Sequence, residues 1–318
     1  MTVRAVVLND YFKRQNFLVA KIALSGAFLI LLSFFSASLA DPLDDGITAE
    51  KQGDFASALK ILTPLAQNGD ARAQYGVGVM YTKGEGVSKS YDEALKWYRL
   101  SETQGNARAS VALGNAYKFG LGVVRDSDEA FKHFKAAADQ GDAEGENNLA
   151  MMYDEGAGVE RDEGATLRYL KMAADQGLSE AQYNIGGRYE RGLGVARDYG
   201  EAAKWYRLAA DQGNAWAQNE LALLFKSGRG VQRDYAEAMK LFLLSAKQAS
   251  PYAQRNLAEI YRDGDVSPRD YVKSYMWFSL LYSEPDMRSV GSRMTHDEIA
   301  QAEVKAEQCR LSKYADCD

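Results

Sequence analysis

The stretch GLSEAQYNIGGRYERGLGVARDYGEAAKWYRLAADQ, residues 177–212, decides the fold of this 318-residue chain. Its 36-residue pattern recurs in strict register, so that six copies span residues 69–104, 105–140, 141–176, 177–212, 213–248 and 249–284. A fixed period of this length is typical of stacked repeats in which each unit contacts only its neighbours. We therefore expect one quasi-linear repeat array and no second globular domain.

Each copy is predicted to form two antiparallel helices. In the quoted copy, Ala181, Ile185 and Tyr189 are four residues apart and mark the packing face of the first helix. Gly192 then stands where a residue in the left-handed conformation ends a helix at low cost. The second helix is expected to begin with a capping box, an Asp or Ser followed three residues later by Glu. This spacing recurs at Ser90 and Glu93, Asp126 and Glu129, Asp198 and Glu201, and Asp234 and Glu237.

Both ends of the array carry degenerate copies. Residues 41–68 read as an N-terminal capping half repeat, because Asp54 occupies the position of Asp198 in the repeat register. Residues 285–318 are expected to form a C-terminal capping helix and a tail. That helix should begin with a capping box of Thr295 and Glu298, followed by an apolar stripe of Ile299, Ala302, Ala306 and Cys309. The predicted fold class is therefore all-α, an α/α superhelical solenoid of helix-turn-helix repeats.

Residues 1–40 have the pattern of a secretory signal peptide. Basic residues precede a 14-residue apolar run, residues 22–35, and small residues lead up to Ala40. We expect cleavage after Ala40 and a location in the periplasm or outside the cell; an uncleaved inner-membrane anchor is the alternative. Without the leader's net charge of +3 the formal charge falls from −6 to −9. An acidic mature chain argues against nucleic-acid binding.

The only two cysteines, Cys309 and Cys317, lie near the C-terminus. In an exported chain they are candidates for a disulfide that ties down the tail, and two free thiols are the alternative. No metal-ligand spacing accompanies them.

The full repeat pattern, A-x-A-Q-Y-x-L-G-x-x-Y-x-x-G-x-G-V-x-x-D-x-x-x-A-x-x-W-Y-x-x-A-A-x-Q-G, resembles that of Sel1-like repeats, relatives of tetratricopeptide repeats. The resemblance covers residues 69–284. It implies an α/α solenoid used for protein-protein interaction, commonly in exported bacterial proteins concerned with envelope assembly, signalling or host contact. One cysteine-rich branch of that family is described as having β-lactamase activity, but here no copy contains Cys.

The candidate binding residues lie on the first helices, which by this resemblance line a concave groove. Trp216 and Tyr252 stand at a repeat position where the other four copies carry a charged residue. Exposed aromatics are typical anchors for a bound chain; the alternative is that the two rings pack on the neighbouring copy. The further candidate groove contacts are Asn148, Asn184, Asn256, Arg108, Glu180 and Glu220.

The sequence thus predicts an exported scaffold or regulator that binds a protein or peptide, such as an envelope sensor or assembly protein. No catalytic residue, metal or cofactor is expected. Ser57 and Lys60 match an S-x-x-K string but lack the companion strings of penicillin-recognising enzymes. His133 takes a repeat position held elsewhere by Trp and is expected to pack. The alternatives are a β-lactamase-like or cell-wall hydrolase and a structural envelope component; partner identity and oligomeric state are not predicted.

Overall fold

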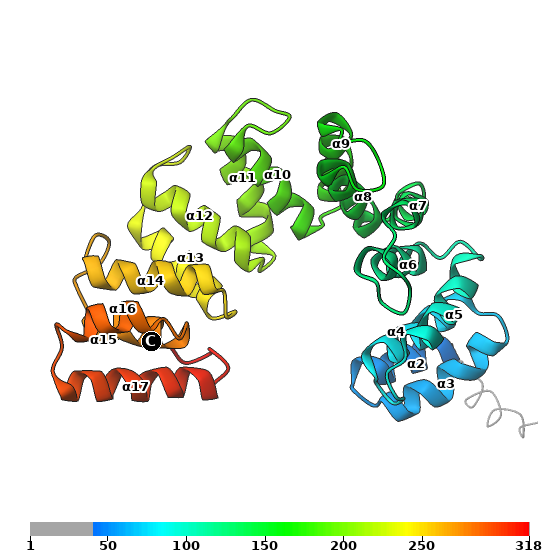
Figure 1. The fold of residues 1–318 in the computed structure, drawn as a ribbon, viewed down its shortest axis with the longest axis horizontal. Coiled ribbons are helices and arrows are strands. Elements are labelled where there is room, and N and C mark those ends of the chain that lie inside the picture. The colour runs from blue at the N-terminus through cyan, green and yellow to red at the C-terminus, as the bar shows by residue number, and fades with distance from the viewer. Residues whose placement is uncertain (1–40, 318) are drawn as a thin grey trace, which may run out of the picture. The chain divides into compact units, whose positions relative to one another are not determined.

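The computed structural model describes residues 41–317, so the predicted leader and its cleavage site after Ala40 lie outside the described residues. These residues form sixteen helices, labelled as in Figure 1. They divide into two compact units, one of residues up to 77 and one of residues 78 onward, so the chain passes from the first to the second within α4. The helices are α2 (Pro42–Lys51), α3 (Phe55–Gln67), α4 (Ala71–Lys83), α5 (Tyr91–Glu102), α6 (Ala107–Phe119), α7 (Ser127–Ala138), α8 (Ala143–Glu155), α9 (Glu163–Asp175), α10 (Ser179–Arg191), α11 (Tyr199–Asp211), α12 (Ala215–Ser227), α13 (Tyr235–Ala246), α14 (Pro251–Asp263), α15 (Tyr271–Leu280), α16 (Glu284–Gly291) and α17 (His296–Leu311).

The first unit packs α2 and α3 against each other. Asp41 caps α2 by accepting a hydrogen bond from the backbone N–H of Leu43, and Leu43 is fully buried. Gly46 permits the close approach, because a Cβ there would lie 2.6 Å from the Leu62 side chain. The predicted half repeat is thus a helix pair in its own right.

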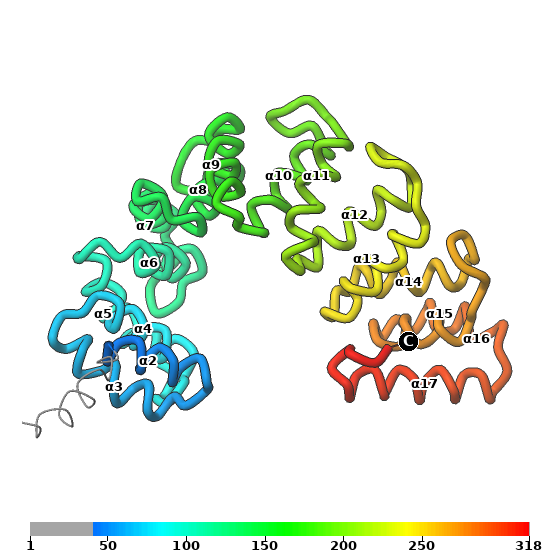
Figure 2. The backbone as a smooth tube through the Cα atoms, turned by 180° about the vertical axis from the view of Figure 1, so that it is seen from behind, coloured from blue at the N-terminus to red at the C-terminus, as the bar shows by residue number. Residues whose placement is uncertain are grey.

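In the second unit the helices from α6 to α16 pack in the order of the chain, each against the one before it, whereas α17 packs against α15. Figures 1 and 2 show this succession of helix pairs from opposite sides. The all-α fold of sequential helix-turn-helix units, as in an α/α solenoid, confirms the predicted fold class.

Within a pair, a small residue on the first helix lies against a large ring on the second. A Cβ added at Gly186 would lie 2.6 Å from the Tyr206 ring, and one at Gly114 would lie 2.6 Å from the Phe134 ring. Both rings are buried. Since real Cβ atoms do not approach other atoms so closely, these glycines set the distance between the two helices.

Between pairs, buried glutamines bridge one repeat to the next. The side chain of Gln218 donates to the carbonyl of Ala210 in the last turn of the preceding helix, at 3.2 Å. Gln182 and Gln254 donate in the same way to Ala174 and Ala246. Each bond satisfies a polar group that would otherwise be buried without a partner.

The helix ends follow the predicted chemistry with one correction. Gly192 is left-handed at the end of α10, with φ 74°, and Asp198 accepts hydrogen bonds from the N–H groups of Gly200 and Glu201. Each predicted capping box in the repeats has its first hydrogen bond, which the side chain of the cap residue accepts. The prediction of the second bond, from the backbone N–H of the cap residue to the Glu side chain, is wrong. In four second helices the N–H of the cap residue donates instead to a carbonyl of the preceding first helix: Ser90 to Tyr81, Asp126 to Tyr117, Asp198 to Tyr189 and Asp234 to Phe225. The Glu side chain then pairs with a Lys one turn further on: Glu93 with Lys96, Glu129 with Lys132, Glu201 with Lys204 and Glu237 with Lys240.

The C-terminal cap has one helix more than expected. Helix α16, with Pro285 in its first turn, precedes α17, whose Thr295 and Glu298 form both halves of the predicted capping box. Ala302, Ala306 and Cys309 are fully buried, as the predicted stripe requires. A disulfide joins Cys309 to Cys317 and folds the tail back onto α17.

None of the helices between residues 41 and 317 combines the length and the apolar character that crossing a membrane requires.

The first residue of each copy provides a test of backbone strain. Ala249 has φ 61°, whereas Gly213 occupies the same repeat position with φ 88° and has no atom within 4 Å of an added Cβ. A left-handed non-glycine residue costs roughly 1–2 kcal/mol, which the greater freedom of Gly in the unfolded chain partly offsets. We expect Ala249→Gly to raise the free energy of unfolding by about 0.5–1 kcal/mol and Gly213→Ala to lower it by about 1 kcal/mol. Denaturant unfolding measures both; a loss of stability in Ala249→Gly would contradict the assignment.

Candidate functional site

Trp216 and Tyr252 form an aromatic pair on the second unit. They occupy the second residue of α12 and of α14, and their ring centroids lie 5.3 Å apart at an interplanar angle of 56°. Trp216 remains 46% exposed and Tyr252 58% exposed. The rings thus contact the neighbouring repeat through each other, and they still present apolar surface to solvent; their role as anchors for a bound chain stays a prediction.

The candidate asparagines use their side chains within the protein. Asn184 donates to the side-chain oxygen of Asn147 at 3.1 Å, and Asn256 donates to that of Asn219 at 2.9 Å. Each of these bonds joins a repeat to the one before it. Asn148 instead donates to the carbonyl of Glu144 in its own helix. Asn184 also donates to the sulfur of Met151 at 3.8 Å. At least one donor of each amide is thus engaged, which leaves less capacity for a bound chain than the sequence suggests.

A cavity of about 540 Å³ lies among α10, α11, α12 and the loop between α10 and α11, and it contains two of the candidate residues, Asn184 and Glu220. The sequence did not single out its other lining residues, which are Tyr183, Gly187, Glu190, Arg191, Arg197, Tyr199 and Tyr206. One feature of the sequence could have pointed to this cavity: Glu220 is the only charged residue at a repeat position that holds Gly, Ala or Asn in the other copies.

Two half-buried carboxylates dominate the cavity. Burial and the neighbouring Glu190 raise the pKa of Glu220 above its ordinary value, and its one side-chain hydrogen bond comes from Asn219 at 3.2 Å. Glu190 accepts a hydrogen bond of 2.7 Å from the hydroxyl of Tyr206. Burial, and then this bond to Glu190, raise the pKa of Tyr206, so Tyr206 is a donor at neutral pH.

The arginines of the cavity are exposed, in contrast to its carboxylates. Arg191 bends back so that its Nε donates to the carbonyl of Gly187 at 3.1 Å. Arg197 lies beside the ring of Tyr199, 5.7 Å from its centroid. Because solvent screens exposed charges more strongly than half-buried ones, the carboxylates have the stronger influence on a group that enters the cavity.

Arg108 and Glu180 do not line this cavity. Both are exposed, Arg108 at the start of α6 and Glu180 at the start of α10, where it accepts a hydrogen bond from Ser179. The structure therefore brings together Trp216 with Tyr252 and Asn184 with Glu220, but it does not gather all eight candidates at one place.

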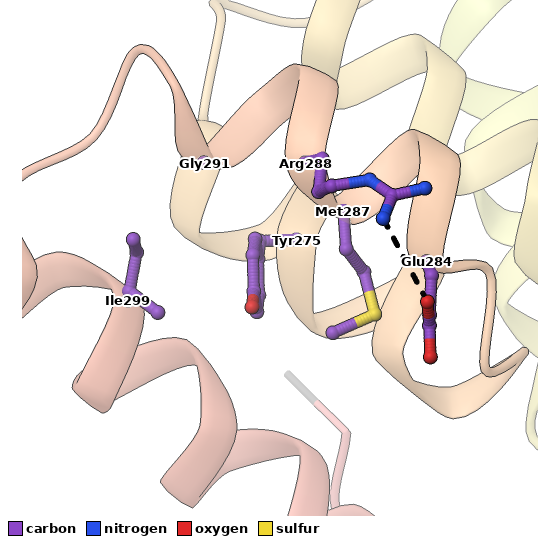
Figure 3. A pocket seen from close by; sticks show the side chains of 6 residues that line it. All are labelled: Tyr275, Glu284, Met287, Arg288, Gly291 and Ile299. Atoms are coloured by element: carbon purple, nitrogen blue, oxygen red, sulfur yellow. Dashed lines mark ion pairs between the residues drawn. The ribbon is translucent and has the colours of Figure 1, made fainter.

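A second cavity, of about 390 Å³, lies where the C-terminal cap meets the last repeat (Figure 3). Tyr275, Met287 and Ile299 form its apolar lining, and Arg288 pairs with Glu284 at 3.9 Å near its edge. Since α16 and α17 both contact α15 here, we assign this cavity to the packing of the cap.

The second helices carry a separate row of exposed apolar side chains that the sequence analysis missed. They share one repeat position and lie at multiples of 36 residues: Leu100, Met172, Leu208 and Leu244. The corresponding Leu280 in α15 is buried. Every copy carries an apolar residue at this position, so the row can be seen in the sequence, but the sequence does not show that these side chains are exposed to solvent.

His133 contacts side chains of neighbouring helices. Its Nδ1 lies 2.7 Å from a carboxylate oxygen of Glu102, and its ring stacks on Tyr117 with centroids 5.4 Å apart. Although burial opposes ionisation, hydrogen bonding to His133 contributes to a lowered pKa of Glu102. Between residues 41 and 317 no three His, Cys, Asp or Glu side chains gather as a metal site would require.

Comparison with known proteins gives a consistent result. The family described as Sel1 repeat matches residues 71–106, 107–142, 143–178, 179–214, 217–250 and 251–284. A crystal structure of a Sel1 repeat protein from Oxalobacter formigenes is 30% identical, covers 76% of this chain and 96% of its own, and has a TM-score of 0.69. A protective antigen present in uropathogenic Escherichia coli strains is 25% identical, with 86% and 76% covered and a TM-score of 0.51. No curated protein sequence matches the chain.

The raised pKa of Glu220 predicts how stability depends on pH. The folded state binds this proton more readily than the unfolded chain, so stability falls as pH rises from the ordinary value of 4.5 through the raised pKa. We expect Glu220→Gln to unfold at a higher denaturant concentration than the wild type at pH 7, with the difference disappearing below pH 4.5.

Glu237→Gln is the matched control of opposite sign. The hydrogen bond from Arg207 lowers the pKa of Glu237, so its contribution is present above pH 4.5 and is lost as pH falls through the folded-state value. This variant should be less stable than the wild type at pH 7. Unfolding curves across the pH range measure both differences, and equal signs for the two variants would refute the assignment.

Proposed function

The chain belongs to the Sel1 repeat family, and on that premise we propose that it binds a protein or peptide through the first-helix face, the surface of α10, α12 and α14 that carries Trp216 and Tyr252. The observation that carries the proposal is the exposed aromatic pair. Aromatic side chains bury a large area on binding and lose little conformational entropy, so such pairs are frequent anchors of interfaces.

The repeat frame supports this use of the first-helix face. Buried bonds such as that from Gln218 to Ala210 hold neighbouring repeats in register, and Asn256 bonds to Asn219 beside the aromatic pair. A face held in this way needs little ordering when a partner binds, which favours affinity. We accordingly place the chain among scaffold or regulatory proteins.

We further propose that the chain is exported and works in the bacterial envelope as a signalling or assembly factor. The leader pattern ending at Ala40 and the disulfide between Cys309 and Cys317 support this location, because disulfides persist in oxidising compartments. We do not extend the proposal to a β-lactamase-like hydrolase. The Ser57 that matched its motif lies in the first turn of α3, where its N–H donates to the capping Asp54.

The aromatic pair is tested by crosslinking in cells followed by purification and mass spectrometry of captured proteins. Replacing both rings, in Trp216→Ala/Tyr252→Ala, should reduce capture of a discrete partner by at least ~10-fold, since a hot-spot residue contributes about 2 kcal/mol or more. The matched control is Leu208→Ala/Leu244→Ala, which removes exposed apolar side chains from the second helices. Loss of the partner in the control alone would place the interface on the other face and refute the proposal.

Export and disulfide formation are tested together by intact mass. The protein isolated from the periplasmic fraction of a bacterial host, after treatment with an alkylating reagent, should have the mass of residues 41–318 with neither cysteine alkylated. Addition of a reductant before the reagent should allow both cysteines to react. An intact leader together with two reactive thiols in the untreated protein would contradict export.

A further inference from the structure

The cavity of about 540 Å³ beside the aromatic pair has the chemistry of a binding site for a single charged side chain. Its volume lies within the range of about 300–1,000 Å³ that is usual for ligand pockets. Tyr183 and Tyr206 provide aromatic walls, with ring centroids 5.8 Å apart, and Glu190 and Glu220 provide half-buried carboxylates. Aromatic rings next to carboxylates attract cations both through their faces and through charge.

The carboxylates keep unused capacity for hydrogen bonds. A carboxylate offers about four acceptor positions, whereas the side-chain bonds described for Glu220 and Glu190 are one each, from Asn219 and from Tyr206. Arg191 interacts with Glu220 through its charge, but the hydrogen bond described for it goes from its Nε to Gly187, and Arg197 lies beside Tyr199. A cation in the cavity would also reduce the repulsion between Glu190 and Glu220.

The cavity and the aromatic pair belong to the same face. Glu220 follows Trp216 by four residues on α12, so the two side chains lie one turn apart on one side of the helix. Tyr183, which lines the cavity, is close enough to Tyr252 and Glu220 for both to influence its pKa, although burial is the largest cause of its rise. A chain lying across the aromatic pair therefore passes over the mouth of the cavity.

We propose that the cavity receives the side chain of an arginine or lysine from the protein that binds the first-helix face, with Glu220 and Glu190 as its carboxylate partners. This inference rests on the proposed function, because it assigns the bound protein a basic residue next to the segment that contacts Trp216 and Tyr252. The exposed Arg191 and Arg197 at the cavity then face the residues that flank that basic residue.

The test uses small mimics of the side chain, so it does not require the partner. Amide resonances of the isotope-labelled full chain are followed during titration with N-acetyl-L-arginine amide and, separately, with its neutral isostere N-acetyl-L-citrulline amide. We expect saturable shifts for residues of α10 and α12 around the cavity. The citrulline compound should bind at least ~10-fold more weakly, because it lacks the charge that strengthens hydrogen bonds to carboxylates.

Two variants locate the partner carboxylates. Glu220→Gln and Glu190→Gln should each weaken binding of the arginine compound by at least ~10-fold, since they remove a charge while keeping the shape of the side chain. Glu180→Gln is the matched control, because Glu180 lies on the same helix α10 but outside the cavity. It should leave the affinity unchanged.

Three outcomes would overturn the inference: absence of saturable shifts, equal affinity for the citrulline compound, or equal losses in Glu180→Gln and Glu220→Gln. Tighter binding of free L-arginine than of the capped compound would assign the cavity to a free amino acid and would also overturn it. Failure of the proposed function is distinguishable, because the crosslinking result with Trp216→Ala/Tyr252→Ala does not depend on the mimics. If the arginine compound binds but the aromatic variant keeps its partner, the cavity still binds a basic side chain, and the role proposed for the aromatic pair is refuted.

Discussion

The buried hydrogen bond from a glutamine on one first helix to the end of the preceding second helix is the interaction on which the repeat frame depends. Gln182, Gln218 and Gln254 each donate to a carbonyl eight residues earlier in the chain. Two of these glutamines also accept a bond from a glutamine 30 residues later, Gln182 from Gln212 and Gln218 from Gln248. A buried amide without partners would cost about 1–3 kcal/mol, so these side chains are satisfied only when the repeats are stacked.

The packing inside each pair complements this bonding between pairs. Gly186 beside Tyr206 and Gly114 beside Phe134 bring the two helices of a pair close together, while the ring fills the space that the missing side chain leaves. One position must be small for the other to be large. The frame therefore constrains the packing residues in every copy and leaves the fourth and eighth positions of each copy to vary.

The stacking of the repeats brings residues at these variable positions next to residues of the neighbouring repeat. Trp216 and Tyr252 are 36 residues apart, but stacking brings their rings to 5.3 Å and makes them one aromatic surface. In the same way Glu220 comes to lie beside Glu190 of the preceding repeat, where burial raises its pKa. A single substitution at a variable position thus changes a surface that two repeats share.

The sequence by itself determined the all-α repeat class, the left-handed glycine that ends α10 and the cap at Thr295, because each depends on the backbone within a few residues. Tertiary structure decided the rest. In four repeats the N–H of the cap residue donates to a carbonyl of the preceding first helix, so the repeat glutamate does not complete its capping box and pairs with a lysine on its own helix. Helix α16 formed where no helix was expected. The cavity around Glu220 and the exposure of Trp216 depend on side chains from different repeats, whose distances are set by helix packing and cannot be read from the order of residues along the chain.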